Sequence, residues 1–193
     1  LTRLTVALRG PSALGSNVLL ACSSSSAHAS GDTALLVKDL RKLATLAVPL
    51  GIKIAYEALS WGRHVNQVMQ SWDLVAEADR ANLGVTLDAF HILAQKTDLG
   101  VLDGIDPAKV FLMQLSDFLW QETRTPDERI ETARHYRVFP GEGVHSDQVS
   151  DMVRRLDAMG YRGDFCFEFF NVDYRHLPLP MVADRARQSV KWI

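Results

Sequence analysis

IKIAYE, residues 52–57, is a largely apolar run that ends on the carboxylate of Glu57. Short apolar runs of four to eight residues are typical of buried strands. A charge at the end of one strand is commonly a solvated rim residue. Glu57 is therefore informative only if other strands of this chain end in the same way.

Short apolar runs alternate along the chain with longer amphipathic stretches. The predicted strands cover residues 17–22, 52–57, 82–88, 110–115 and 164–170. The predicted helices cover about 33–48, 64–78, a short piece in the nineties, 126–135, 146–159 and 183–193, with Ser146 as the cap of its helix. Continuous apolar strands between helices are typical of a parallel sheet that helices cover.

Two architectures fit this alternation, a closed (β/α)8 TIM barrel and an open doubly wound sheet. We count about six strand–helix units, whereas a closed barrel needs eight and about 250 residues. On the count alone the open sheet is a fair choice. The ends of the strands favour the barrel, because four of them carry an oxygen-bearing side chain: Glu57, Asp88, Gln114 and Glu168.

These four side chains predict a metal site. In a parallel barrel the carboxyl ends of all strands open on one face, so the side chains would converge there. Three converging carboxylates repel one another unless a cation lies between them. Three carboxylates and an amide suit a hard divalent cation, and we expect Mg, Mn or Co. The lack of thiol and His ligands argues against structural zinc.

The predicted domain is a single α/β TIM barrel over residues 1–193. It lacks its first one or two strand–helix units in this chain, which begins at what would be the third strand, and a further domain after the C-terminus is left open. The 21 basic and 23 acidic residues give a formal net charge of −2 and form no basic cluster. No apolar run approaches the roughly 18 residues that span a bilayer.

We therefore expect neither a nucleic-acid nor a membrane partner, and a homo-oligomer is left open. Cys22 and Cys166 lie in apolar runs without metal-ligand spacing. They are predicted to be reduced core thiols, which favours a cytoplasmic protein.

Five motifs resemble the xylose-isomerase-like TIM-barrel superfamily, which includes sugar isomerases, epimerases and apurinic endonucleases. They are YEALSWGRHVN, TLDAFHIL, MQLSD, RVFPGEG and FCFEFFN. Within the superfamily they are most similar to the bacterial 3-dehydroshikimate dehydratases, including a form fused to a dioxygenase-like domain. The resemblance covers nearly the whole chain, and YEALSWGRH and LDAFH are its most specific parts.

The resemblance implies a metal-dependent lyase whose substrate is a small hydroxy-keto acid. The implied reaction dehydrates 3-dehydroshikimate to protocatechuate through an enediolate that the metal stabilises. The implied metal ligands are again Glu57, Asp88, Gln114 and Glu168. Gln114 stands where most of the superfamily has His, and this favours the dehydratases over the isomerases.

The resemblance also implies roles around the metal. His91, three residues after Asp88, is the implied catalytic base. Arg137, three residues before the PGEG turn, matches a substrate-binding arginine, and a guanidinium suits a carboxylate. Arg63 and Arg134 are alternatives to it. Further candidates for substrate contact are Arg63, His64, Ser116 and Asn171, while Trp61 and Phe90 either wall the pocket or pack.

Three other functions stay open. A sugar or inositol-derivative isomerase or epimerase would use the same metal and the same proton abstraction. A non-catalytic barrel remnant that binds metal or a partner protein is the second, supported by the strands that the chain lacks. A DNA-repair endonuclease is the poorest, because it would need more His ligands and a basic face.

Overall fold

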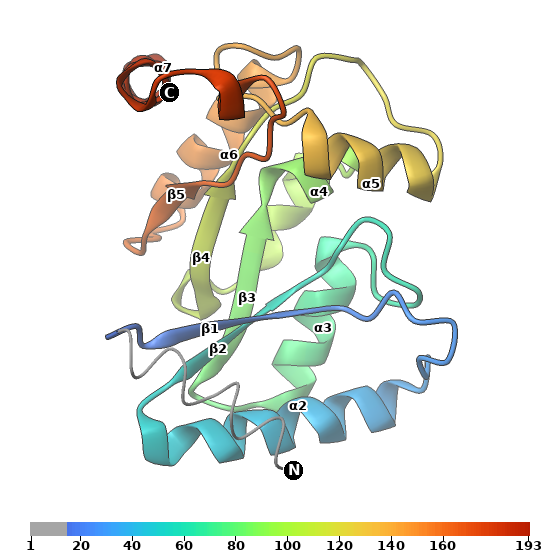
Figure 1. The fold of residues 1–193 in the computed structure, drawn as a ribbon. Coiled ribbons are helices and arrows are strands. Elements are labelled where there is room, and N and C mark those ends of the chain that lie inside the picture. The colour runs from blue at the N-terminus through green and yellow to red at the C-terminus, as the bar shows by residue number, and fades with distance from the viewer. Residues whose placement is uncertain (1–14) are drawn as a thin grey trace.

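The computed structural model describes residues 15–193, so residues 1–14 of the predicted domain lie outside it. Its five strands form one parallel sheet in the order β1-β2-β3-β4-β5, each strand pairing with its neighbours in sequence (Figure 1). The strands are β1 Val18–Cys22, β2 Lys53–Glu57, β3 Leu83–Asp88, β4 Val110–Leu115 and β5 Phe165–Phe167. All five predicted strands are confirmed, and β5 is the shortest because it ends before Glu168.

Helices connect the strands. They are α2 Thr33–Ala47, α3 Val68–Ala78, α4 Ala89–Ala94, α5 Pro126–His135, α6 Ser146–Ala158 and α7 Leu179–Trp192, with 3₁₀ turns η1 Val48–Leu50, η2 Leu99–Gly104, η3 Pro107–Lys109 and η4 Tyr174–His176. The bounds predicted for α5 are confirmed. Pro126 occupies its first turn, and Thr125 and Glu128 form a capping box that fixes where it begins.

Two predicted helix starts and one predicted helix cap are wrong. α3 begins at Val68 rather than near residue 64, since the preceding residues form a loop at the end of β2. α7 begins at Leu179, four residues before the predicted 183. Ser146 is not the cap of α6, because His145 occupies that position and the Ser146 hydroxyl donates instead to Asp117 Oδ2 at 2.5 Å.

One face of the sheet packs against helices. Successive strand residues point to opposite faces. Ile54 of β2 belongs to a hydrophobic core with Leu40 of α2 and Val75 of α3, and Ile92 of α4 and Met152 of α6 extend the same core. Helices from four connections therefore cover a single face, which is the arrangement of a barrel wall and not of a doubly wound sheet.

The opposite face carries polar side chains in register. Cys22 pairs with Glu57, Asp88 pairs with Gln114, and Gln114 pairs with Cys166. Paired residues of parallel strands share a face, so these side chains line up across the carboxyl ends of the sheet. Both cysteines are free; Cys22 is exposed and Cys166 is half-buried. The prediction that they are core thiols is therefore wrong.

The C-terminal part of the chain lies beyond the carboxyl ends of β3 and β4 (Figure 1). Residues 136–138 form bridges to the segments that leave β4 and β5, at Asp117 and Asn171. A second, smaller core joins Phe139 and Tyr174 to Val182 of α7. Within residues 15–193 no helix combines the length and the apolar character that crossing a membrane requires.

Candidate active site

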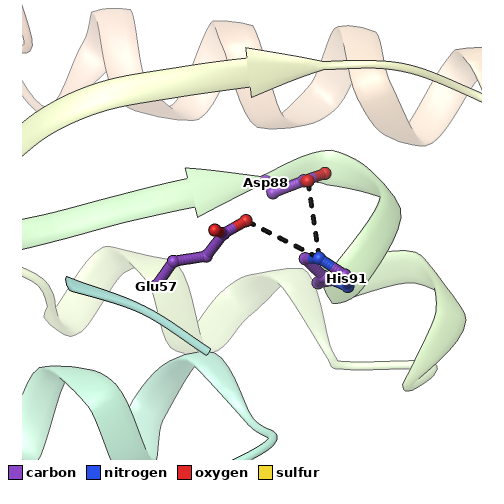
Figure 2. Close-up of side chains that lie close together, drawn as sticks. All are labelled: Glu57, Asp88 and His91. Atoms are coloured by element: carbon purple, nitrogen blue, oxygen red, sulfur yellow. Dashed lines mark ion pairs between the residues drawn. The ribbon is translucent and has the colours of Figure 1, made fainter. Parts of the chain in front are cut away.

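Two buried carboxylates stand at adjacent strand ends. Glu57 is the last residue of β2 and is 3% exposed, and Asp88 is the last residue of β3 and is 2% exposed. Asp88 Oδ1 accepts the Phe90 N–H at 2.7 Å, which caps α4 and fixes the carboxylate. Figure 2 shows Glu57 and Asp88 directed toward the ring of His91.

His91 lies in the short helix that follows Asp88. Its Nε2 is 3.6 Å from Glu57 Oε1 and 3.6 Å from Asp88 Oδ2. Its Nδ1 accepts the Ser60 backbone N–H at 3.1 Å, so the proton of the neutral ring is assigned to Nε2. Burial lowers the pKa of His91 to about 4, and the ring is neutral at pH 7.

Arg137 is the cation of this cluster. It is buried, and its Nη1 lies 2.8 Å from Asp88 Oδ2 and 3.4 Å from Glu168 Oε2. Its guanidinium carbon is 4.6 Å from the centroid of the Phe90 ring. One guanidinium thus bridges two of the four predicted metal ligands.

The pKa values of the three carboxylates differ because Asp88 lies closest to the Arg137 guanidinium. Burial, together with the charge of Asp88, raises the pKa of Glu57 to about 7 and that of Glu168 to about 8. Burial also works to raise the pKa of Asp88, but the Arg137 guanidinium and His91 outweigh it and hold that pKa below its usual value. Ionising all three carboxylates together is therefore costly without more positive charge.

The cluster fits a divalent cation. One ligand atom each from Glu57, Asp88 and His91 lies within 4.8 Å of the others. In the described residues this group includes His91, which was not a predicted ligand, and does not include the predicted ligand Glu168. Gln114 is buried beside Asp88, and its Oε1 has no hydrogen-bond partner in the part of the chain that the structure describes. A buried amide oxygen without a donor is a ready ligand for a hard cation. When all three carboxylates are ionised they carry three negative charges, and the Arg137 guanidinium supplies one positive charge. A divalent cation would supply the two positive charges that balance the rest.

We expect divalent cations to bind more tightly as pH rises through 7 and 8. Below these values Glu57 and Glu168 hold protons that a cation must displace, and above them they do not. A Mn²⁺ titration at pH 6.0 and pH 8.5 should show affinity higher at pH 8.5 by on the order of tenfold or more. Equal affinities at the two pH values would contradict this assignment.

A cavity of about 430 Å³ opens over the cluster, a size typical of small-molecule sites. Its lining includes Glu57, His91, Arg137 and Glu168 on the polar side and Leu20, Leu59, Trp61 and Phe170 on the apolar side. Trp61 meets the His91 ring edge-on, with centroids 4.8 Å apart. The cavity thus combines an apolar wall with a floor of titratable groups.

The loop after β2 places two predicted contacts elsewhere. His64 is exposed, and its Nε2 lies 2.9 Å from the carbonyl oxygen of Ala29. Arg63 is exposed as well, and its backbone N–H donates to Ser24 O at 2.8 Å. Neither side chain is among those that line the cavity in residues 15–193.

Ser116 and Asn171 are buried behind the cavity. The Ser116 hydroxyl has no hydrogen-bond partner within the described residues. Asn171 donates through Nδ2 to the carbonyl oxygen of Arg137 at 3.0 Å. The Asn171 side chain therefore holds the backbone of Arg137 and the turn that follows Asn171. Its amide group is engaged in these contacts and does not line the cavity in the described residues.

Two close neighbours of the cluster were not predicted from the sequence, Ser60 and Cys22. The Ser60 hydroxyl lies 3.0 Å from His91 Nδ1, and the Ser60 carbonyl accepts from Gln95 and Arg129. The Cys22 thiol donates to Glu57 Oε2 at 3.1 Å, and partial burial of the sulfur on that side together with the charge of Glu57 raises the pKa of the thiol, although the residue as a whole is exposed. Both contacts join residues more than 30 positions apart. No local pattern can reveal such a pair.

Comparison with known proteins identifies the family. The family model described as a xylose isomerase-like TIM barrel matches residues 2–193. The chain belongs to this family. The resemblance drawn from the motifs is thereby confirmed, and with it the barrel rather than the open sheet.

Relatives of this family member carry two activities in their names. A 3-dehydroshikimate dehydratase of Pseudomonas putida is 41% identical over 180 residues, which are 93% of this chain and 27% of that protein. An inosose isomerase of Halalkalibacterium halodurans is 30% identical over 150 residues, 73% of this chain and 48% of that protein. The chain spans about a quarter of the length of the dehydratase.

A solved structure also matches this chain over only part of its own length. A xylose isomerase-like TIM barrel/4-hydroxyphenylpyruvate dioxygenase fusion protein superposes with a TM-score of 0.87 at 37% identity. The match covers 99% of this chain and 29% of that one. This chain is thus similar to the barrel part of a longer protein.

Proposed function

We propose that this chain carries the active site of a metal-dependent dehydratase, which converts 3-dehydroshikimate to protocatechuate. The observation that carries the proposal is the 41% identity to the Pseudomonas putida dehydratase over 93% of the chain. The site supports it, because a neutral histidine faces two carboxylates at the floor of a cavity of suitable size.

Glu57, Asp88, Gln114 and Glu168 would hold the cation, and Mg, Mn or Co would each suit these oxygen ligands. A bound divalent cation supplies polarisation of the ring ketone, which acidifies the neighbouring C–H bond. Arg137 touches two of these ligands and lines the cavity. We therefore assign it to the keto-hydroxyl end of the substrate, where its charge faces the oxygen that becomes negative.

His91 is the proposed proton carrier, acting through Nε2. To accept the proton from the carbon next to the ketone, Nε2 must be free, so the ring must hold its proton on Nδ1. The Ser60 hydroxyl, 3.0 Å from Nδ1, is the group that can accept from that N–H. The Ser60 backbone N–H faces the same Nδ1 and holds the ring proton on Nε2 in the resting site. His91 would therefore work as a base after the ring proton moves to Nδ1 and this N–H contact is given up, and the Ser60 hydroxyl would stabilise that second tautomer.

The remaining steps need no further group. Protonated His91 can return its proton to the β-hydroxyl, which leaves as water as the enediolate electrons form the new double bond. The resulting dienone loses one ring proton, gains one on oxygen and becomes the aromatic catechol. Aromatisation makes the overall reaction effectively one-way.

We expect Ser60→Ala to lower kcat by about 10- to 100-fold with little change in cation affinity, because it removes a partner of the acting group and no ligand. Steady-state kinetics and a Mn²⁺ titration measure the two effects. Ser71→Ala is the control, since this buried hydroxyl bonds only to the Val68 carbonyl in the described residues. Equal kcat for both variants would remove Ser60 from the mechanism.

The function itself is tested by adding 3-dehydroshikimate to protein that has been stripped of metal and then reloaded with Mg²⁺, Mn²⁺ or Co²⁺. Ultraviolet absorbance should report a catechol product only after reloading. An isomerase acting on inososes is the second candidate, favoured by the 30% identity to the Halalkalibacterium halodurans enzyme. Turnover of an inosose without any catechol from 3-dehydroshikimate would replace the dehydratase by that candidate.

A further inference from the structure

The cavity has more cationic groups than the metal cluster uses. Besides Arg137, its lining includes Arg134 from α5 and Arg175 from η4. Both side chains are exposed, and in residues 15–193 neither forms a hydrogen bond or an ion pair. Arg137 by contrast is bound to Asp88 and Glu168. The charges of Arg134 and Arg175 are therefore the ones available to an incoming anion.

The turn that carries Arg175 is firmly held. Asn171 Oδ1 accepts the backbone N–H groups of Asp173 and Tyr174 at 2.9 and 3.2 Å. Tyr174 is buried, its ring stacks on Phe139 with centroids 5.6 Å apart, and its hydroxyl donates to Glu142. Arg175 thus projects from a rigid turn, so fixing its side chain on a ligand costs little backbone ordering.

We propose that Arg175, assisted by Arg134, binds the carboxylate of the substrate and so selects acids over neutral ring ketones. The inference rests on the proposed function and names the group that recognises one end of its substrate. In 3-dehydroshikimate the carboxylate and the keto-hydroxyl pair lie at opposite ends of the ring. Arg137 is already paired with Asp88 and Glu168 at the floor, so Arg134 and Arg175 at the wall are the groups that meet the carboxylate.

The test compares two ligands that share the catechol ring, protocatechuate with its carboxylate and catechol without it. Isothermal titration of the Mn²⁺-loaded full chain should show that the wild-type protein binds protocatechuate more tightly. Arg175→Gln should weaken protocatechuate binding by about tenfold or more and leave catechol binding within about twofold. Arg175→Lys keeps the charge without the fork, so its loss should be intermediate.

Arg154→Gln is the matched control, because Arg154 is an exposed arginine of α6 that does not line the cavity in the described part of the chain. It should bind both ligands as wild type does. With 3-dehydroshikimate as substrate, Arg175→Gln should raise KM and change kcat by less than about threefold. Arg175 is exposed, so thermal melting of the variant should match that of wild type.

The outcomes separate this inference from the proposed function. Unchanged protocatechuate binding in Arg175→Gln, or no preference of the wild-type protein for the carboxylate ligand, would overturn it. If protocatechuate binding depends on Arg175 but the protein forms no catechol product from 3-dehydroshikimate, the carboxylate site is supported and the proposed dehydratase activity is refuted. Equal losses for catechol and protocatechuate would show a general defect of the cavity and would also overturn it.

Discussion

Glu57→Gln is expected to lower kcat/KM for 3-dehydroshikimate by about 10³-fold or more. The substitution keeps the shape of the side chain but removes one of the negative charges that would bind the cation. Mn²⁺ affinity should fall together with activity. Exposed Glu131→Gln on α5 is the control and should behave as wild type.

The same variant should fold at least as well as the wild-type protein. Because burial and Asp88 raise the pKa of Glu57 to about 7, the folded state disfavours its charged form. A raised carboxyl pKa means that this group costs stability as pH rises from its unfolded value of about 4.3 through 7. Thermal melting at pH 8 in the presence of a chelator should therefore give Glu57→Gln a Tm equal to or above that of wild type. A large fall in Tm would attribute the lost activity to unfolding.

His91→Gln is expected to lower kcat by about 10²- to 10⁴-fold, the range typical of a lost general base. Cation affinity should stay within a few-fold of wild type if His91 moves protons and is not a ligand. Steady-state kinetics and a Mn²⁺ titration on the same preparation measure both. His91 Nε2 is close enough to Glu57 and Asp88 to bind the same ion, so the cation affinity of this variant distinguishes a proton carrier from a metal ligand. A 10- to 100-fold loss of cation affinity would make His91 a ligand instead.

The sequence predicts the strand ends well because they obey local rules. Apolar runs mark each strand, and Glu57 and Asp88 interrupt them at the point where a parallel sheet delivers its side chains to one face. α5 is predicted to the residue, since Thr125, Pro126 and Glu128 define its start within four positions.

Other parts of the site depend on contacts that no local pattern contains. Ser146 has the type of residue that caps helices, but Asp117 competes for its hydroxyl across 29 positions. Ser60 reaches His91 only because the loop after β2 folds back over α4. Arg175 faces the cavity because Tyr174 anchors its turn against Phe139. These placements come from tertiary packing, which the sequence does not display.

In the proposed site, four oxygen ligands at the strand ends hold a divalent cation. The most direct measurement is anomalous diffraction from crystals of this chain grown with Mn²⁺. We expect one strong anomalous peak coordinated by Glu57, Asp88, Gln114 and Glu168, at the carboxyl ends of β2 to β5. A peak away from these residues, or no peak at saturating Mn²⁺ and pH 8.5, would contradict it.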